Sequence, residues 1–389
     1  MTDRRRIMNG NKKEQEGKIL YITGSFPRLG DGIGDAAGKL YDAIEDKNNI
    51  ELVTSNSDEI AKYVKEKQYS QVQLVNDWKY RTISNLIKRI IKENIDKVLI
   101  EYAGNGYKKD LAISFLPLRI RIHNLFSKEK VQCHLRLHEF SMCRPARKIF
   151  TYPLVWFCHH MDTPSYVEYK ILSKKYGDKV TKSRIGSNLN WREHDKESDK
   201  NSKNKIVLAF FGGIYPGKGI EKLLELWGKL EKENPGIYEY QLLGGFPKGL
   251  TNAFDDYQLH VERLIKEQGL DGKITVSGFL PEDEIEKWLD GVDIAVLPYE
   301  DGLTLRRGSF LAFLGRQVAV VTSEGDEEAK KMFMDSSGVK MCTSSDEMME
   351  EILSFSKENK YIKAGLDNIK YRDCFDWKKI SENVLGSFR

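Results

Sequence analysis

The chain has few cysteines and no long apolar run. Its five cysteines are scattered and form no CxxC pair: Cys133, Cys143, Cys158, Cys342 and Cys374. This spacing argues against a disulfide framework and against a structural zinc site, and it fits a reducing cytoplasm. No segment approaches the roughly 18 consecutive apolar residues that a membrane-spanning helix requires. Residues 1–17 carry charge but no apolar stretch, so we expect a disordered leader rather than a secretory signal. A cytoplasmic protein is predicted, with a peripheral location at the inner face of the cell membrane as the alternative to a freely dissolved one.

Lysine and arginine are less frequent in the second half of the chain than in the first. Residues 1–200 hold 37 Lys and Arg against 26 Asp and Glu, a net charge of +11, while residues 201–389 hold 25 against 32, a net charge of −7. This asymmetry favours an anionic partner for the first half, and phosphate-rich acceptors, acidic membrane surfaces and nucleic acid are the candidates. A solvated basic surface without a partner is the alternative. No nucleic-acid-binding module is recognisable, so no nucleic-acid partner is expected.

Short apolar strands alternate with amphipathic helical stretches along the 389 residues, a length typical of two domains. In the first part, strands are expected at 18–26, 50–55, 97–102 and 134–140. The pattern restarts after a polar stretch, with strands expected at 205–212, 238–245, 273–279, 292–299 and 318–323. This alternation predicts an α/β fold with two Rossmann-like, doubly wound domains, each built on a parallel sheet.

The composition also predicts where the domains end. We expect a first domain at 18–190, a linker at 191–205, a second domain at 206–370 and a C-terminal helix within 371–389 that returns to the first domain. Open α/β sheets bind ligands at the carboxyl ends of their strands. The two domains are therefore expected to face a ligand-binding cleft.

The loop at 211–219, FGGIYPGKG, joins a strand to a helix. Its glycines let the backbone approach a phosphate, the helix start adds partial positive charge, and Lys218 adds a full charge. The spacing is close to a Walker A loop, but Gly219 stands where a Ser or Thr would hold Mg²⁺, which argues against an NTPase. The alternative is a glycine turn beside a surface lysine.

A second anion-binding pattern lies at 299–310, YEDGLTLRRGSF. It places Arg306, Arg307 and the Ser309 hydroxyl at the start of a helix, where guanidinium groups and the helix dipole both favour phosphate oxygens. The alternative is that one arginine pairs with Glu300 or Asp301 and the other is solvated. Two phosphate-type loops in one domain suit a diphosphate.

In this order, the motifs resemble family 4 of the GT-B glycosyltransferases over about residues 18–389, in a branch that carries a DGxxLRRGS segment. The matching segments are FPRLGDGIGD (26–35), LRLHEF (135–140), RIGSNLN (184–190), FFGGIYPGKGIEKLLEL (210–226) and the stretch from 276 to 323. The commoner pattern of the family has two glutamates eight residues apart, and their positions are Thr304 and Ala312 here.

The resemblance implies the site residues and the reaction. It implies a retaining transfer of a sugar from a nucleoside-diphosphate sugar, with His138, Lys218 and Arg306 as catalytic residues. The donor would also contact Gly32, Ile33, Gly213, Gly278, Phe279, Thr304, Arg307, Gly308 and Ser309. No metal and no other cofactor is expected, because cationic side chains and helix starts can stabilise the leaving diphosphate. The only DxD-like candidate, Asp290 to Asp293, has the wrong spacing.

The acceptor is expected to bind the first domain, as a glycan or a lipid-linked sugar in the synthesis of a cell-surface polysaccharide or glycoconjugate. Its candidate contacts are Asp35, Glu101, Tyr102, Arg119 and Arg121. The last two lie in the stretch 115–126, where apolar residues interleaved with arginines suit a helix on an anionic membrane. The alternative is a helix that packs its apolar face on its own sheet. A non-catalytic scaffold that resembles these enzymes is the alternative for the whole chain.

Overall fold

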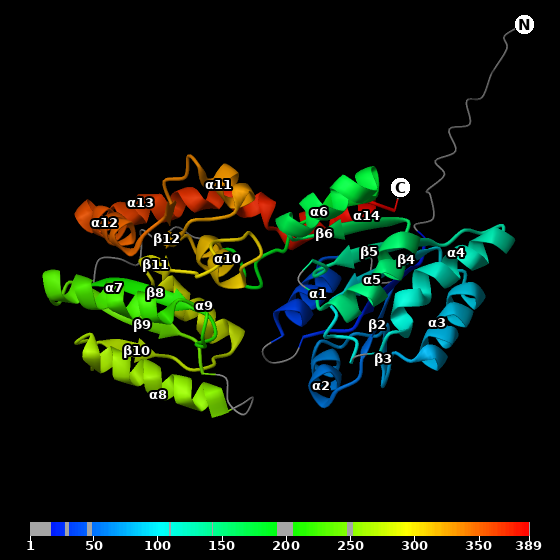
Figure 1. The fold of residues 1–389 in the computed structure, drawn as a ribbon, viewed down its shortest axis with the longest axis horizontal. Coiled ribbons are helices and arrows are strands. Elements are labelled where there is room, and N and C mark those ends of the chain that lie inside the picture. Colours follow the sequence, from blue (N-terminus) through cyan, green and yellow to red (C-terminus); the bar gives the residue numbers. More distant parts are fainter. Residues whose placement is uncertain are drawn as a thin grey trace, which may run out of the picture. The chain divides into compact units, whose positions relative to one another are not determined.

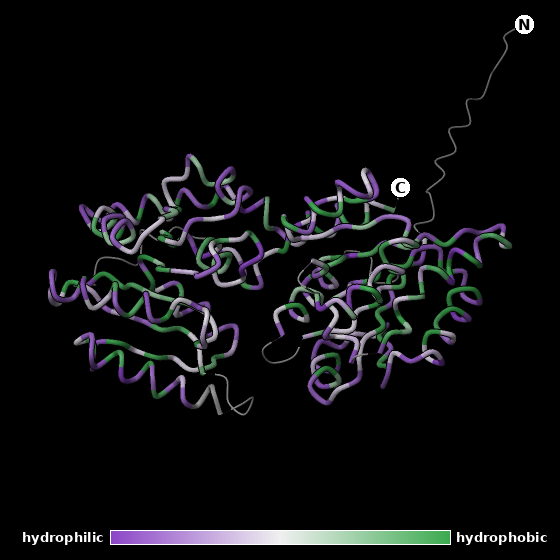
Figure 2. Tube along the Cα trace, viewed as in Figure 1, coloured by the Kyte–Doolittle hydropathy of each residue, from purple (hydrophilic) through white to green (hydrophobic). Residues whose placement is uncertain are grey.

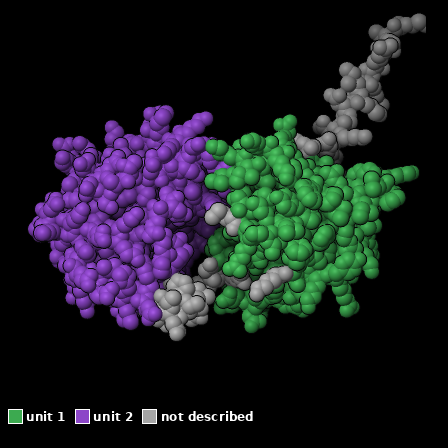
Figure 3. All heavy atoms as spheres, in the orientation of Figure 1, with its two compact units in different colours: residues 1–163, 167–181, 384–389 green, residues 164–166, 182–383 purple. Residues whose placement is uncertain are grey.

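A computed structural model of the chain describes residues 17–27, 31–44, 49–108, 110–141, 143–192, 205–246 and 252–388, without the side chains of 252–255. The chain divides into two compact units (Figure 3). Unit 1 takes residues 1–163, 167–181 and 384–389, and unit 2 takes residues 164–166 and 182–383. The chain passes from unit 1 to unit 2 near residue 181, before the linker expected at 191–205. Most of that linker and nearly all of the expected leader lie outside the described residues.

Unit 1 is built on a seven-stranded sheet with the order β3-β2-β1-β4-β5-β6-β7 (Figure 1). Its strands are β1 (Ile19–Thr23), β2 (Ile50–Ser55), β3 (Val72–Val75), β4 (Lys97–Tyr102), β5 (Gln132–Leu137), β6 (His160–Thr163) and β7 (Val180–Lys182). Its main helices are α1 (Gly32–Ala43), α2 (Asp58–Glu66), α3 (Tyr80–Lys92), α4 (Leu116–Phe126), α5 (Pro145–Phe157) and α6 (Tyr166–Tyr176). Strand β1 pairs in parallel with both β2 and β4.

Unit 2 repeats this plan with a six-stranded sheet in the order β10-β9-β8-β11-β12-β13. Its strands are β8 (Ile206–Phe211), β9 (Tyr238–Leu243), β10 (Ile274–Val276), β11 (Ile294–Leu297), β12 (Ala319–Ser323) and β13 (Val339–Cys342). Its helices are α7 (Ile220–Glu233), α8 (Asn252–Glu267), α9 (Glu282–Asp290), α10 (Gly308–Gly315), α11 (Glu327–Phe333), α12 (Ser345–Ser356) and α13 (Lys360–Asp367). Helix α14 (Trp377–Gly386) begins in unit 2, and its residues from Val384 onward belong to unit 1. The predicted pair of parallel, doubly wound domains is confirmed.

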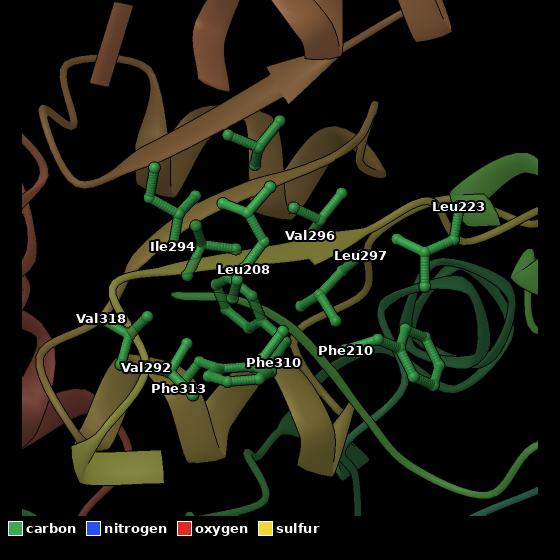
Figure 4. Close-up of a cluster of buried hydrophobic side chains, with 14 of the residues drawn as sticks. Leu208, Phe210, Leu223, Val292, Ile294, Val296, Leu297, Phe310, Phe313 and Val318 are labelled. Carbon is green, nitrogen blue, oxygen red and sulfur yellow. The ribbon is translucent and has the colours of Figure 1, made fainter. Parts of the chain in front are cut away.

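The helices carry their apolar residues toward the sheets. Hydrophobic and hydrophilic residues alternate along them (Figure 2), and α3, for example, buries Ile83, Leu86 and Ile90. In unit 2, strand residues such as Leu208 and Ile294 pack with Phe310 and Phe313 of α10 (Figure 4). Helix α10 begins at Gly308, within the segment 299–310 where a helix start is predicted.

Strand order reverses at one place in each sheet, between β1 and β4 in unit 1 and between β8 and β11 in unit 2. The loops that follow these strands diverge to opposite sides of the sheet, which leaves room for a ligand at the carboxyl ends of the strands. The predicted lysine loop follows β8, and the predicted double-arginine segment follows β11. Both predicted phosphate loops therefore flank the reversal in unit 2.

Candidate functional site

The glycine loop after β8 depends on glycine at the start of α7. Gly217 and Gly219 have φ angles of 86° and 78°, which other residues rarely adopt. A Cβ atom on Gly219 would lie 2.0 Å from the carbonyl oxygen of Pro298, at the end of β11. Glycine therefore allows this loop to lie directly against the chain that leaves β11.

Lys218 lies between those two glycines and is half-buried. Its ammonium group lies 4.8 Å from the ring centroid of Tyr215. Within the described residues Lys218 has no carboxylate partner, and Gly219, the N-cap of α7, supplies no side-chain cap. An unpaired cation and the amides of an uncapped helix start thus share one loop, as an anion site requires.

The two arginines after β11 have different environments. Arg307 donates from Nη2 to the Asp301 carboxylate and from Nε to the carbonyl of Gly302 at 3.1 Å. Its guanidinium carbon lies 4.1 Å from the ring centroid of Tyr299. Arg306 is exposed and has no ion-pair or hydrogen-bond partner among the described residues. One arginine is therefore paired, as the alternative interpretation held, and the other is available to a ligand.

Tyr299 organises the start of α10, and sequence reasoning gave it no role. Its hydroxyl forms a 2.6 Å hydrogen bond with the hydroxyl of Ser309. Burial of the ring raises the pKa of Tyr299 to about 12, so the phenol stays protonated. Arg307, the N-cap of α10, makes no side-chain cap bond to the first turn, and Gly308 is exposed. The amides at this helix start have no capping side chain, and Thr304 contributes its carbonyl to Arg307 N at 3.2 Å.

The two loops of unit 2 lie next to each other. A Cβ atom on Gly212 would be 4.0 Å from Cβ of Ser309, and one on Gly217 would be 4.0 Å from the Glu300 carboxylate. The predicted phosphate loops therefore meet at the carboxyl ends of β8 and β11. Gly213 is in the same loop, with the Tyr215 ring 2.9 Å from the place of its missing Cβ.

Phe279 is an exposed aromatic ring at the carboxyl ends of β9 and β10. It is 56% exposed, and a Cβ atom on Gly245 would lie 2.6 Å from its ring. Ser277 holds the turn before it, since its hydroxyl accepts from Gly244 N and donates to the carbonyl of Gly278, both at 2.9 Å. A flat ring resting on glycine backbone is a suitable stacking surface for an aromatic base.

A cavity of about 460 Å³ is lined by the chain that follows β11 and by residues after β12 and β13. Its charged lining consists of Lys222 and three carboxylates, those of Glu300, Asp301 and Glu324. An excess of carboxylates does not suit an anionic ligand. We therefore place the candidate anion site at Lys218 and Arg306 rather than in this cavity.

In unit 1, the predicted donor amides lie at the first turn of α1. Gly32 is exposed and Ile33 is half-buried. The Asp31 carboxylate already caps this helix by accepting from Gly34 N at 3.0 Å, and Asp35 N donates to the Asp31 carbonyl at 2.9 Å. The helix start is therefore partly satisfied within the chain, unlike the starts of α7 and α10.

His138 and two of the predicted acceptor residues are buried. His138 is 4% exposed, and its Nε2 lies 2.7 Å from Oε1 of Glu101. Glu101 is 1% exposed and also accepts from the Tyr21 hydroxyl. Tyr102 is 3% exposed, and burial raises its pKa. In the described conformation Glu101 and Tyr102 face neighbouring side chains, so neither presents its side chain to an acceptor.

The two arginines of α4 bind neighbouring elements. Arg119 donates to the Ser84 hydroxyl at 2.9 Å, and Arg121 donates to the carbonyls of Phe157 and Cys158 at 3.0 and 3.2 Å. At the end of α4, Leu125 and Phe126 are 77% and 86% exposed. The outward surface at this end of α4 is therefore apolar, and both arginines are engaged in contacts within unit 1.

Among the described residues, no group of three or more His, Cys, Asp or Glu side chains is arranged to hold a metal ion. The helices in the described ranges include none that combines the length and the apolar character needed to cross a bilayer.

No protein-family model matches the chain, and no curated protein matches it. Several solved structures do match the chain. The chain is similar to a sucrose-phosphate synthase from Thermosynechococcus elongatus, with 11% identity, a TM-score of 0.66 and coverage of 96% of this chain and 98% of the other. It is similar to HepE from Anabaena, determined in complex with UDP and glucose, with 13% identity, a TM-score of 0.66 and coverage of 96% and 99%.

A third similar structure is a putative UDP-N-acetylglucosamine 2-epimerase from Listeria monocytogenes, with 12% identity, a TM-score of 0.60 and coverage of 95% of each chain. At these identities the likeness concerns the fold, because one fold hosts different activities. The chain therefore has the two-domain, Rossmann-like GT-B fold over nearly its whole length.

Proposed function

We propose that the chain is a glycosyltransferase that moves a sugar from a nucleoside-diphosphate sugar to an acceptor. The observation that carries the proposal is the pair of cations, Lys218 and Arg306, at two helix starts that flank the strand reversal of unit 2. Neither has a carboxylate partner among the described residues. Two cations without counter-ions on adjoining loops favour a polyanionic ligand such as a diphosphate.

The donor is proposed to be a UDP-sugar. The complex of HepE with UDP and glucose supports this choice, since that protein shares the fold. In the proposed arrangement the diphosphate binds the amides of Gly308 and Ser309, and the base stacks on Phe279. Gly213, Gly278 and Thr304 are proposed as backbone contacts beside them.

The proposed reaction is a metal-independent transfer with retention of configuration. The bond between the anomeric carbon and the diphosphate oxygen breaks, and the acceptor hydroxyl oxygen bonds to that carbon. The hydroxyl proton passes to an oxygen of the leaving diphosphate. Lys218 and Arg306 stabilise the charge that grows on the diphosphate, and His138 contacts a hydroxyl of the transferred sugar.

The acceptor is proposed to be a glycan or a lipid-linked sugar at an anionic membrane surface, in the synthesis of a cell-surface glycoconjugate. The exposed Leu125 and Phe126 of α4, with Trp156 of α5 at 53% exposure, support a peripheral contact. Trp156 also stacks on Tyr152, over which the ammonium of Lys175 lies at 5.2 Å. Aromatic rings interleaved with lysines suit the interface of an anionic bilayer.

Nucleotide release from a panel of nucleotide sugars, with and without EDTA, tests this function. We expect release of UDP that depends on added acceptor and survives EDTA. Abolition by EDTA with recovery on adding Mn²⁺ would contradict the metal-independent mechanism. Conversion of the donor to an epimer without acceptor would favour an epimerase instead.

A non-catalytic scaffold is the second candidate, and Ala312 favours it. This residue is 2% exposed and stands where the commoner pattern of the family has a glutamate. Calorimetric binding of UDP-sugar without turnover, across a broad set of acceptors, would support the scaffold. Turnover with any acceptor would exclude it.

A further inference from the structure

A row of buried charged side chains crosses the sheet of unit 1. Alternate residues of a strand point to the same face, so His134, Arg136 and His138 share one face of β5 and its extension. The backbone of His138 continues the strand pairing, since its N–H donates to the carbonyl of Tyr102 at 3.1 Å. In the register of the sheet, Arg136 stands opposite Glu101 of β4 and Asp162 of β6.

These side chains contact one another in sequence across the row. Nε2 of His138 lies 2.7 Å from Oε1 of Glu101, and Nε of Arg136 lies 3.6 Å from the same oxygen. Nη1 of Arg136 donates to Oδ2 of Asp162 at 2.9 Å. Nε2 of His134 then lies 2.6 Å from Oδ1 of Asp162.

The row ends at the C-terminal segment of the chain. The Ser387 hydroxyl lies 2.6 Å from Nδ1 of His134, and the ring of Phe388 lies 5.6 Å from the His134 ring. Residues 384–389 belong to unit 1, as does His134. The last described residues of the chain are thus connected to His138 by four intervening side chains.

Burying this row of side chains costs folding free energy, which argues against a purely structural role. His134, Arg136, His138, Glu101 and Asp162 are each 4% exposed or less. Charged groups lose their hydration when buried, and apolar residues of similar volume often stabilise a core as well as paired charges do. A row of this kind at the end of a central strand therefore suits a role in orienting a side chain.

We propose that Glu101 is a positioning residue that fixes the tautomer and orientation of His138, with the row from Arg136 to Ser387 holding the Glu101 carboxylate in place. The inference rests on the proposed glycosyl transfer. A carboxylate only accepts hydrogen bonds, so Nε2 of His138 carries the hydrogen and donates it to Oε1. The Tyr21 hydroxyl donates to the other oxygen and limits rotation of the carboxylate.

The consequence for His138 concerns its second ring nitrogen. Nδ1 has no hydrogen-bond partner among the residues that the structure describes. With Nε2 protonated, Nδ1 keeps its lone pair and can accept a hydrogen bond from a hydroxyl group. In this proposal the sugar donates to Nδ1, and Glu101 acts only through His138.

The ring ¹⁵N chemical shifts of His138 test the inference without an activity assay. They are measured in the full chain labelled at histidine, and the His138 signals are assigned by comparison with His138→Gln. We expect the wild type to show the Nε2–H tautomer. Glu101→Gln removes the charge and leaves the shape, and it should give a mixture of tautomers. In the transfer assay the same variant should lower kcat by roughly 10- to 100-fold, the range for partners that orient a functional histidine, with a small change in KM for the donor.

Two further variants keep the test decisive. Glu101→Asp retains the charge beside Arg136 but withdraws the carboxylate from His138, and it should reproduce the loss if Glu101→Gln does not fold. Glu231→Gln is the matched control, because Glu231 of unit 2 is also buried and accepts from a tyrosine hydroxyl and a lysine. It should leave the His138 shifts and kcat unchanged.

The outcomes separate the inference from the proposed function. Wild-type shifts and wild-type kcat in folded Glu101→Gln would overturn the inference. Absence of transfer by the wild type with every donor would overturn the proposed function and, with it, the positioning role of Glu101 in transfer. The shifts would then decide only whether Glu101 sets the tautomer.

Discussion

Lys218 and Arg306 are the residues on which the proposed chemistry depends most directly. Each is accessible and lacks a counter-ion in the described part of the chain, so its removal leaves no buried charge and no core cavity. Lys218→Ala and Arg306→Ala should each lower kcat/KM by roughly 100-fold, the scale for removal of one group that stabilises transition-state charge. The melting temperature should change little. Steady-state kinetics with a working donor and acceptor measure the effect.

Lys229→Ala is the control for these variants, since Lys229 is an exposed lysine on α7, the helix that follows Lys218, and it pairs with Asp346. It should retain full activity. The double variant of Lys218 and Arg306 should lose less than the product of the single losses, because both act on one diphosphate. Full turnover in both single variants would show that the donor site lies elsewhere.

His159 should make the stability of unit 1 depend on pH. Burial lowers its pKa to about 4 from 6.5, with Arg121 and Lys179 adding to the shift, and its Nδ1 accepts from Cys133 N at 3.0 Å. Below pH 6.5 the unfolded chain binds a proton that the folded chain does not, so the free energy of unfolding should fall as the pH falls toward 4.

Urea unfolding at pH 7 and pH 5 tests this prediction, with His159→Gln as the variant. The glutamine side-chain oxygen can still accept a hydrogen bond from Cys133 N, and glutamine does not titrate. The difference in stability between the two pH values should be smaller for the variant. It should not vanish, because burial also lowers the pKa of His160. An unchanged difference would contradict the assignment.

At the scale of an element, the loop from β8 to α7 depends on Gly219. Alanine there would adopt a φ of 78° and place its Cβ 2.0 Å from the Pro298 carbonyl oxygen. Gly219→Ala should therefore cost about 1–3 kcal/mol of stability, and it should lower kcat/KM by moving Lys218. Gly236→Ala is the control: its φ is 76°, but a Cβ there meets nothing within 4 Å. It should show a smaller loss of stability and unchanged activity, and equal activity in both variants would contradict the role of the loop.

At the scale of the whole molecule, the basic first half and the apolar end of α4 should together direct the protein to anionic membranes. We expect cosedimentation with vesicles that contain phosphatidylglycerol, weakening as salt rises and screens the charges. Replacing Leu125 and Phe126 by Ser should reduce binding without lowering the melting temperature, since both are exposed. Ile237→Ser, at an exposed position of unit 2, should have no effect. Equal binding to neutral vesicles would point to a soluble acceptor.

The sequence alone determined the features that depend on neighbouring residues. The alternation of short apolar strands with amphipathic helices led to two parallel sheets, because periodicity is a local property of the chain. Local patterns also marked two helix starts. These patterns are the glycines and the lysine at 211–219 and the arginines at 306 and 307. Strands β3, β6, β7 and β13, of three or four residues each, were not predicted, whereas the equally short β10 and β11 lie within longer predicted segments.

Only the tertiary structure decided which side chains are paired and which are free. Arg306 and Arg307 are adjacent in sequence, yet packing against Tyr299 pairs one and leaves the other exposed. Polar residues at alternate positions 134, 136 and 138 of an apolar strand were a signal for the buried row. Its partners were not visible in the sequence, because Glu101 lies 37 residues from His138 and Ser387 lies 253 from His134. Such pairs form when strand register and chain folding bring distant residues together, and no local pattern encodes that distance.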